Sequence, residues 1–182
     1  MNLPNLVTII RIILVPVMVI FLLNEKFTHT LVVFVIAVVS DGLDGAIARA
    51  FKQKTALGAF LDPLADKLLL TTAYVILSVY DYVPVWLAVM IVSRDVIILS
   101  GLAVLSAYDS FPDIKPTIDS KVTTYFQMAT IVYLLAFNHN ALNSKTAVFL
   151  IAVTAVMTAI SGIRYIIIGF RLFESIEDGA GE

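Results

Sequence analysis

The sequence predicts an all-α integral membrane protein with six transmembrane helices, and three observations lead to this fold class. Hydrophobic residues make up 60% of the 182 residues and charged residues only 14%. An ordinary soluble domain is about half apolar and about a quarter charged. The apolar residues are concentrated in six long runs that short polar links separate. Each run is close to the roughly 20 residues that a helix needs to cross a bilayer.

The expected helices cover residues 6–23, 29–51, 56–80, 85–107, 120–137 and 145–173. The first begins with an amphipathic stretch, so its start is expected to lie along the membrane interface. Pro84 precedes the fourth helix, and two prolines with three aspartates in 108–119 predict an irregular surface loop. We expect one membrane domain over residues 1–173, followed by a solvated acidic tail over residues 174–182.

Basic residues predict the orientation, because short cytoplasmic loops of membrane proteins carry an excess of lysine and arginine. A cytoplasmic N-terminus places five basic residues of the loops and adjoining helix ends inside and two outside, so both termini are predicted to be cytoplasmic, in the inner or cell membrane. The five are Lys52, Lys54, Lys115, Lys121 and Arg171, and the two are Lys26 and Lys145. The net charge of −2 predicts no nucleic-acid partner, and the lack of cysteine excludes disulfides and thiolate metal sites.

Four aspartates stand out within this apolar chain. Asp41 and Asp44 are three residues apart near the cytoplasmic end of the second expected helix, and Asp62 and Asp66 are four apart at the start of the third. Either spacing places two side chains on one face of a helix. The two pairs, joined by a short link, are therefore expected to form one cluster of carboxylates just beneath the cytoplasmic surface.

Such a cluster needs compensation, since one charged group in a membrane helix costs about 2.5–3.5 kcal/mol. The carboxylates could pair with nearby cations, line a water-filled cavity, or bind divalent cations. Ligands that offer only oxygen favour hard ions such as Mg²⁺, Ca²⁺ or Mn²⁺. Four aspartates could hold two such ions, an arrangement that suits displacement at phosphorus. The cations in question are Arg49, Lys67, Arg94, Lys121 and Arg164.

Small residues accompany the carboxylates. Gly45 and Ala48 follow Asp44, and Gly58 lies one turn before Asp62. Small side chains allow a ligand or a neighbouring helix to approach the backbone closely. Arg49 can offer a planar fork to a phosphate. Together these residues indicate room for a bulky phosphate ligand.

The spacing of these residues resembles a known family. Asp41-x2-Asp44-Gly45-x2-Ala48-Arg49-x8-Gly58-x3-Asp62-x3-Asp66 matches the CDP-alcohol phosphatidyltransferase signature at each fixed position, and the length and helix count agree. The resemblance implies transfer of a phosphatidyl group from CDP-diacylglycerol to an alcohol, with release of CMP, by a membrane homodimer with a cytoplasmic cavity. It also implies two divalent cations, Mg²⁺ or Mn²⁺, at the four aspartates, with Asp66 as the base. By the same resemblance Gly45, Ala48, Arg49 and Gly58 surround the CDP moiety.

The acceptor alcohol is less well defined. The opening PNLVTIIRIILVPV resembles both phosphatidylglycerophosphate synthases and eukaryotic-type cardiolipin synthases, whereas residues 93–102 and 115–128 resemble the cardiolipin branch. Ala103 stands where many glycerophosphate-using members have arginine. Arg94, Lys121 and Arg164 could form a cationic pocket for the acceptor. We predict glycerol 3-phosphate, the commoner acceptor among short chains with this opening, and phosphatidylglycerol as the alternative.

Two other classes fit the carboxylates less well. An intramembrane prenyltransferase would use aspartates to hold a diphosphate, but the glycine, alanine and arginine pattern around them argues against it. A transporter or channel would place carboxylates along its ion path, and the lack of an obvious internal repeat weakens that alternative.

Overall fold

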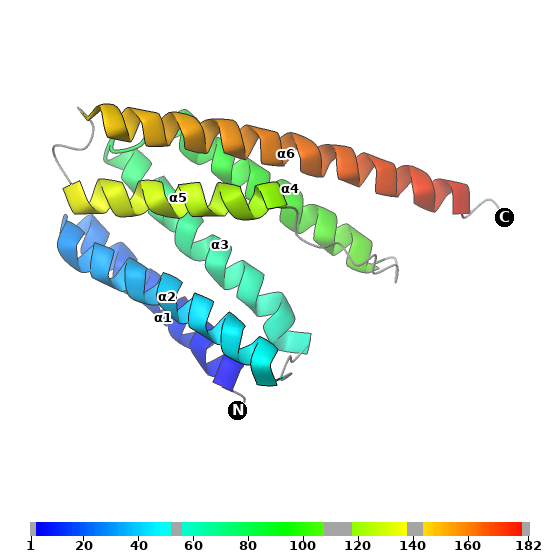
Figure 1. Cartoon of the computed structure of the whole chain (residues 1–182), viewed down its shortest axis with the longest axis horizontal. Helices are drawn as coiled ribbons and strands as arrows, with labels where there is room; N and C mark the ends of the chain where they lie inside the picture. The colour runs from blue at the N-terminus through cyan, green and yellow to red at the C-terminus, as the bar shows by residue number, and fades with distance from the viewer. Residues whose placement is uncertain (1–2, 52–55, 108–117, 138–143, 180–182) are drawn as a thin grey trace.

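The protein is a bundle of six helices in the computed structural model, which describes the backbone of residues 3–51, 56–107, 118–137 and 144–179 and the side chains of 10–40, 67–101, 119–137 and 144–169. The last two helices lie close to the long axis of the molecule, and the first four are inclined to it (Figure 1). They are α1 (Leu3–Leu23), α2 (Phe27–Phe51), α3 (Ala56–Val79), α4 (Val85–Ala107), α5 (Ile118–Phe137) and α6 (Lys145–Gly179). The described residues contain no strand.

The helix positions follow the apolar runs of the sequence, with one clear difference. α6 continues to Gly179, so the helix extends beyond Phe173 into the segment that was expected to be an acidic tail. Within the described residues, one stretch, Lys145–Gly169, is long and apolar enough to cross a membrane by itself. Shorter apolar stretches lie at Ile10–Leu23, Phe27–Ser40 and Lys67–Val79.

Two tight links set the antiparallel course of the first four helices. Glu25, after α1, has a φ of 54°, and Asp81, after α3, has a φ of 59°. In each link the next amide reaches back five residues: Lys26 N donates to the Phe21 carbonyl and Tyr82 N to the Leu77 carbonyl. Such bonds around a left-handed residue end a helix while satisfying its last carbonyls.

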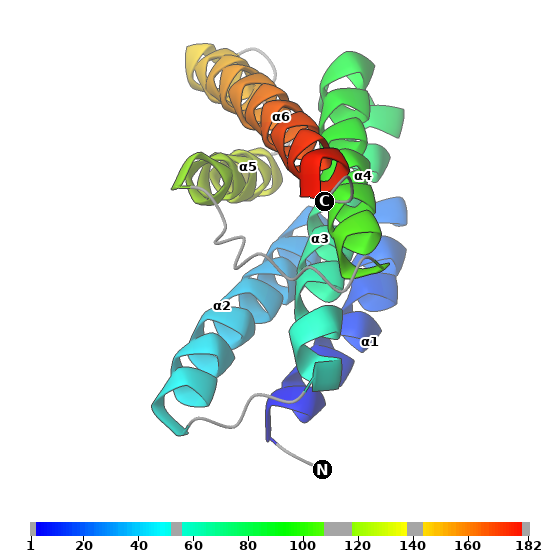
Figure 2. The same ribbon diagram turned by 90° about the vertical axis from the view of Figure 1, so that its right-hand side faces the viewer.

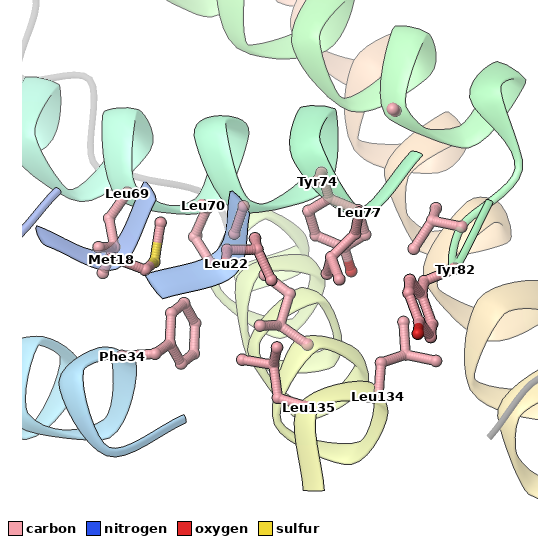
Figure 3. Close-up of a cluster of buried hydrophobic side chains, with 14 of the residues drawn as sticks. Met18, Leu22, Phe34, Leu69, Leu70, Tyr74, Leu77, Tyr82, Leu134 and Leu135 are labelled. Carbon is pink, nitrogen blue, oxygen red and sulfur yellow. The ribbon is translucent and has the colours of Figure 1, made fainter. Parts of the chain in front are cut away.

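The apolar core lies in the half of the bundle that contains these two links. α1, α2, α3 and α5 contribute buried side chains that meet there (Figure 3): Met18, Leu22, Phe34, Leu69, Leu70, Tyr74, Leu77, Leu134 and Leu135. The hydroxyl of the fully buried Tyr74 donates to the Gln127 carbonyl of α5 at 3.0 Å. This half therefore holds the helices together by close apolar packing.

Polar side chains join α5 and α6 next to this core, where Tyr74 contacts Gln127. The Thr130 and Thr154 hydroxyls are 2.8 Å apart, and Gln127 Nε2 donates to the Thr158 hydroxyl at 3.3 Å. All four side chains are buried. Hydrogen bonds between membrane helices contribute about 0.6–2 kcal/mol each. The α5–α6 pair is thus held by a polar seam as well as by apolar contacts.

Candidate active site

The backbone brings the two aspartate pairs to one end of the bundle. Asp41 and Asp44 lie on α2, and Asp62 and Asp66 lie on α3. The two members of each pair are about one helical turn apart. Figure 2 looks onto this end, where α2 ends and α3 begins. The side chains of residues 41–66 lie outside the described part of the structure. The expected carboxylate cluster therefore remains a prediction that the helix positions allow.

The residues expected around CDP share this location. Gly45, Ala48 and Arg49 lie on α2 and Gly58 lies on α3. Their side chains belong to the same undescribed stretch, so their contacts also remain a prediction.

The structure describes Arg94 on α4 fully, and this side chain is buried, with 3% of its surface exposed. Its Nε donates to Ser161 Oγ of α6 at 3.2 Å, and its Nη2 donates to the same oxygen at 2.8 Å and to Ser120 Oγ of α5 at 2.6 Å. Its Nη1 donates to the Asp95 carboxylate at 2.7 Å. The guanidinium also lies over the Tyr165 ring, 5.8 Å from its centre. All three nitrogens of Arg94 therefore have partners inside the protein.

Asp95 joins the same network to α3. Its Oδ1 accepts from the Lys67 ammonium at 2.5 Å, and its Oδ2 accepts from the Thr71 hydroxyl at 3.4 Å. Asp95 is buried, while 19% of the Lys67 side chain is exposed. The Asp95 carboxylate thus forms ion pairs with two cations, Lys67 and Arg94. Through Arg94 and Asp95 together, α4 is connected to α3, α5 and α6.

The other two cations predicted to bind the acceptor lie in more open surroundings. Lys121, in the first turns of α5, is exposed. Arg164 of α6 pairs with Asp119 of α5, and 59% of its side chain is exposed. Ser120, which accepts from Arg94, lies between Asp119 and Lys121 in the sequence. Arg94 and Arg164 thus contact neighbouring residues at the start of α5, where Lys121 also lies. Arg94 is enclosed by the protein, whereas Lys121 and Arg164 are accessible.

In the sequence, Lys67 is one of several possible partners for the four aspartates, and Asp95, beside Arg94, could either pair with a cation or orient one. The structure pairs Lys67 with Asp95 directly. A signal was present, because a carboxylate within an apolar helix needs a cation at the same depth. Ser120 and Ser161 gave no such signal, since serine is common in helices that pack against each other.

Divalent cations fit the donor set of the aspartate stretch. Four carboxylates on two consecutive helices provide only hard oxygen donors, which suit Mg²⁺ or Mn²⁺. Among the described residues there is no group of three or more His, Asp or Glu side chains that could hold a metal ion. Asp41, Asp44, Asp62 and Asp66, whose side chains lie outside the described part of the structure, remain the predicted metal ligands.

Comparison with known proteins identifies the family of the chain. Residues 1–169 match the sequence profile of the CDP-alcohol phosphatidyltransferase family. The chain is 36% identical to the cardiolipin synthase (CMP-forming) of Homo sapiens, over 97% of this chain and 64% of the human protein. It is 35% identical to the CDP-diacylglycerol–glycerol-3-phosphate 3-phosphatidyltransferase of Haemophilus influenzae, over 91% of both chains. The corresponding Aquifex aeolicus protein is 31% identical, over 94% of this chain and 98% of the other.

The chain therefore spans about two thirds of the length of the human cardiolipin synthase and nearly the whole length of the two bacterial enzymes. The match to the family profile covers both aspartate pairs and all six helices up to Gly169 of α6. The chain belongs to the CDP-alcohol phosphatidyltransferase family.

Proposed function

We propose that the protein transfers the phosphatidyl group of CDP-diacylglycerol to an alcohol and releases CMP. The observation that carries this proposal is the spacing of four aspartates on two consecutive helices. α2 ends, and α3 begins, at the same end of the bundle. The acceptor hydroxyl attacks the phosphorus attached to diacylglycerol, and the bond from that phosphorus to CMP breaks. No covalent intermediate with the protein is needed.

Different residues of the chain have different roles in this proposed reaction. Asp66 takes the proton of the attacking hydroxyl, which raises the nucleophilicity of its oxygen. Gly45, Ala48 and Gly58 leave space for the CDP moiety, and Arg49 offers its fork to a phosphate. Two divalent cations, Mg²⁺ or Mn²⁺, held by Asp41, Asp44, Asp62 and Asp66, would supply positive charge to the diphosphate and to the departing CMP.

Glycerol 3-phosphate is the acceptor we propose first. Lys121 and Arg164 are exposed on α5 and α6, where their positive charges are accessible to the dianionic phosphate of a small soluble acceptor, and Arg164 also pairs with Asp119. The Haemophilus influenzae and Aquifex aeolicus relatives, which match this chain over nearly their whole length, carry the name of that activity.

Phosphatidylglycerol is the second candidate. The human protein named cardiolipin synthase aligns over 97% of this chain, and Ala103 follows Gly-Leu where many glycerophosphate-using members have arginine. Phosphatidylglycerol also presents a phosphate beside its free hydroxyls. Lys121 and Arg164 are therefore compatible with either acceptor, and only a product assay separates the two.

A membrane location completes the proposal. The six helices have 20 to 35 residues, which at about 1.5 Å per residue suffices for a hydrocarbon layer of about 30 Å. Large apolar side chains point outward on every helix, among them Ile13, Val32, Val79, Val89, Tyr125 and Phe149. We propose six spans, both termini and the active site on the cytoplasmic side of the inner or cell membrane, and a homodimer.

The test is to incubate the purified protein with CDP-diacylglycerol and Mn²⁺ and to add glycerol 3-phosphate, phosphatidylglycerol, serine or inositol phosphate separately. We expect CMP release and one new lipid, identified by mass. Asp66→Asn should abolish turnover while circular dichroism stays unchanged, and full activity in this variant would refute the base assignment. Release of no CMP with any acceptor, or turnover of a prenyl diphosphate instead, would refute the proposed reaction.

A further inference from the structure

Lys67, Arg94 and Asp95 form a largely buried charge cluster, which we call the α4 charge cluster. Its two cations share one carboxylate, with Lys67 Nζ at 2.5 Å and Arg94 Nη1 at 2.7 Å from the same oxygen. Two positive charges and one negative charge leave a net charge of +1. The remaining partners, Thr71, Ser120 and Ser161, are neutral hydroxyls.

This excess charge is adjacent in the sequence to the aspartate stretch. Lys67 directly follows Asp66 on α3. Arg94 is 97% buried and Asp95 is nearly as enclosed, so water screens the cluster poorly and its field reaches further than that of exposed charges. By contrast, Lys121 and Arg164 are exposed and act on their surroundings through solvent.

We propose that the net charge of the α4 charge cluster sets the divalent-cation affinity of the aspartate site, with Asp95 as the counter-ion that keeps this charge low enough for the metal to bind. The inference rests on the proposed function, since it takes Asp41, Asp44, Asp62 and Asp66 as the metal ligands. Asp95 contacts neither metal nor substrate in this scheme. It is a positioning residue that acts through the Lys67 ammonium and the Arg94 guanidinium.

The net charge of the cluster determines the order of Mn²⁺ affinities expected among three variants. Asp95→Asn keeps the shape of the side chain and raises the cluster charge to +2, which opposes binding of a cation. Lys67→Gln lowers the charge to zero and leaves the Arg94–Asp95 pair intact. The double variant carries only Arg94 as a charged member and returns to +1. If Asp95 served geometry alone, adding Lys67→Gln to Asp95→Asn would disturb the cluster further instead of restoring it.

The experiment measures Mn²⁺ binding to metal-depleted protein in neutral detergent by electron paramagnetic resonance of the unbound ion, so no turnover is required. We expect a dissociation constant on the order of tenfold higher than that of the unchanged protein for Asp95→Asn. Lys67→Gln should bind Mn²⁺ more tightly than the unchanged protein does. The double variant should bind Mn²⁺ as tightly as the unchanged protein. Lys145→Gln, which removes an exposed lysine at the start of α6, should leave binding unchanged.

The outcomes separate the two proposals. Equal Mn²⁺ affinity in the unchanged protein and Lys67→Gln overturns the inference, while CMP release by the unchanged protein leaves the proposed function standing. A double variant that binds more weakly than Asp95→Asn also overturns it. If the unchanged protein binds no Mn²⁺, both the inference and the metal site of the proposed function fail. Lys67→Gln decides the matter even where Asp95→Asn does not fold, because it keeps the buried arginine paired.

Discussion

Replacing Arg94 by methionine should destabilise the bundle strongly, because this one side chain connects α4 to α5 and α6 and to the carboxylate of its own helix. The change removes four hydrogen bonds, two to Ser161 and one each to Ser120 and Asp95. At about 0.6–1 kcal/mol for each bond in a membrane protein, the expected loss is about 3 kcal/mol. Breaking a buried ion pair costs about 3–5 kcal/mol. The lower end applies here because Asp95 keeps its bond to Lys67.

Arg164→Met is the matched control, since it also removes an arginine from an arginine–aspartate pair. The Arg164 side chain is 59% exposed and its partner is Asp119. Exposed pairs of this kind contribute about 0–1 kcal/mol, so the control should lose at most about 1 kcal/mol. The measurement is reversible unfolding in mixed micelles with increasing dodecyl sulfate, followed by circular dichroism. A loss in Arg94→Met no larger than that in Arg164→Met would refute the argument that the buried network holds the helices together.

Three further predictions concern other parts of the molecule. Tyr74→Phe should reduce the free energy of unfolding by about 1 kcal/mol in the same assay, because a fully buried hydroxyl loses its bond to the Gln127 carbonyl. An unchanged stability would contradict this. Lys121→Gln should raise the KM for glycerol 3-phosphate about tenfold while the KM for CDP-diacylglycerol stays the same, and an equal rise in both would exclude a specific acceptor contact. Burial, and then the charge of Glu25, raise the pKa of Tyr82 above its ordinary value of 10.0. The folded protein therefore holds this proton more tightly than the unfolded chain, and stability should fall as the pH rises above about 10. Tyr82→Phe should reduce this decline in unfolding measured at pH values on either side of 10, and an identical decline in the variant would rule Tyr82 out as its cause.

The sequence alone predicts the helices well, because their cause is local. Each apolar run is long enough for a helix, and the interruptions at Glu25, Asp81 and Pro84 coincide with the ends of helices in the structure. The clear miss is the end of α6, which continues to Gly179. The residues after Phe173 are more polar, and this polarity predicts a solvated acidic tail, yet glutamate and isoleucine there are compatible with a helix.

The aspartate stretch is also determined by local sequence. Asp41, Asp44, Asp62 and Asp66 lie at helical spacings on two consecutive helices, so the linear pattern already places them at one end of the bundle and identifies the family. No long-range contact is needed for that conclusion. The similarity to known enzymes agrees with it over residues 1–169.

Only the tertiary structure decides which cations are enclosed and which are accessible. The sequence groups Arg94 with Lys121 and Arg164 as cations that could bind the acceptor, and it places Arg94 nearer the middle of the membrane without showing which of the three is enclosed. The partners of Arg94 are Ser120 and Ser161, 26 and 67 residues away. Lys67 is 28 residues from Asp95. Contacts at such separations depend on how α3, α5 and α6 pack around α4. The physical reason is that helical periodicity determines which side of a helix a residue occupies, whereas the packing of neighbouring helices determines what it meets there.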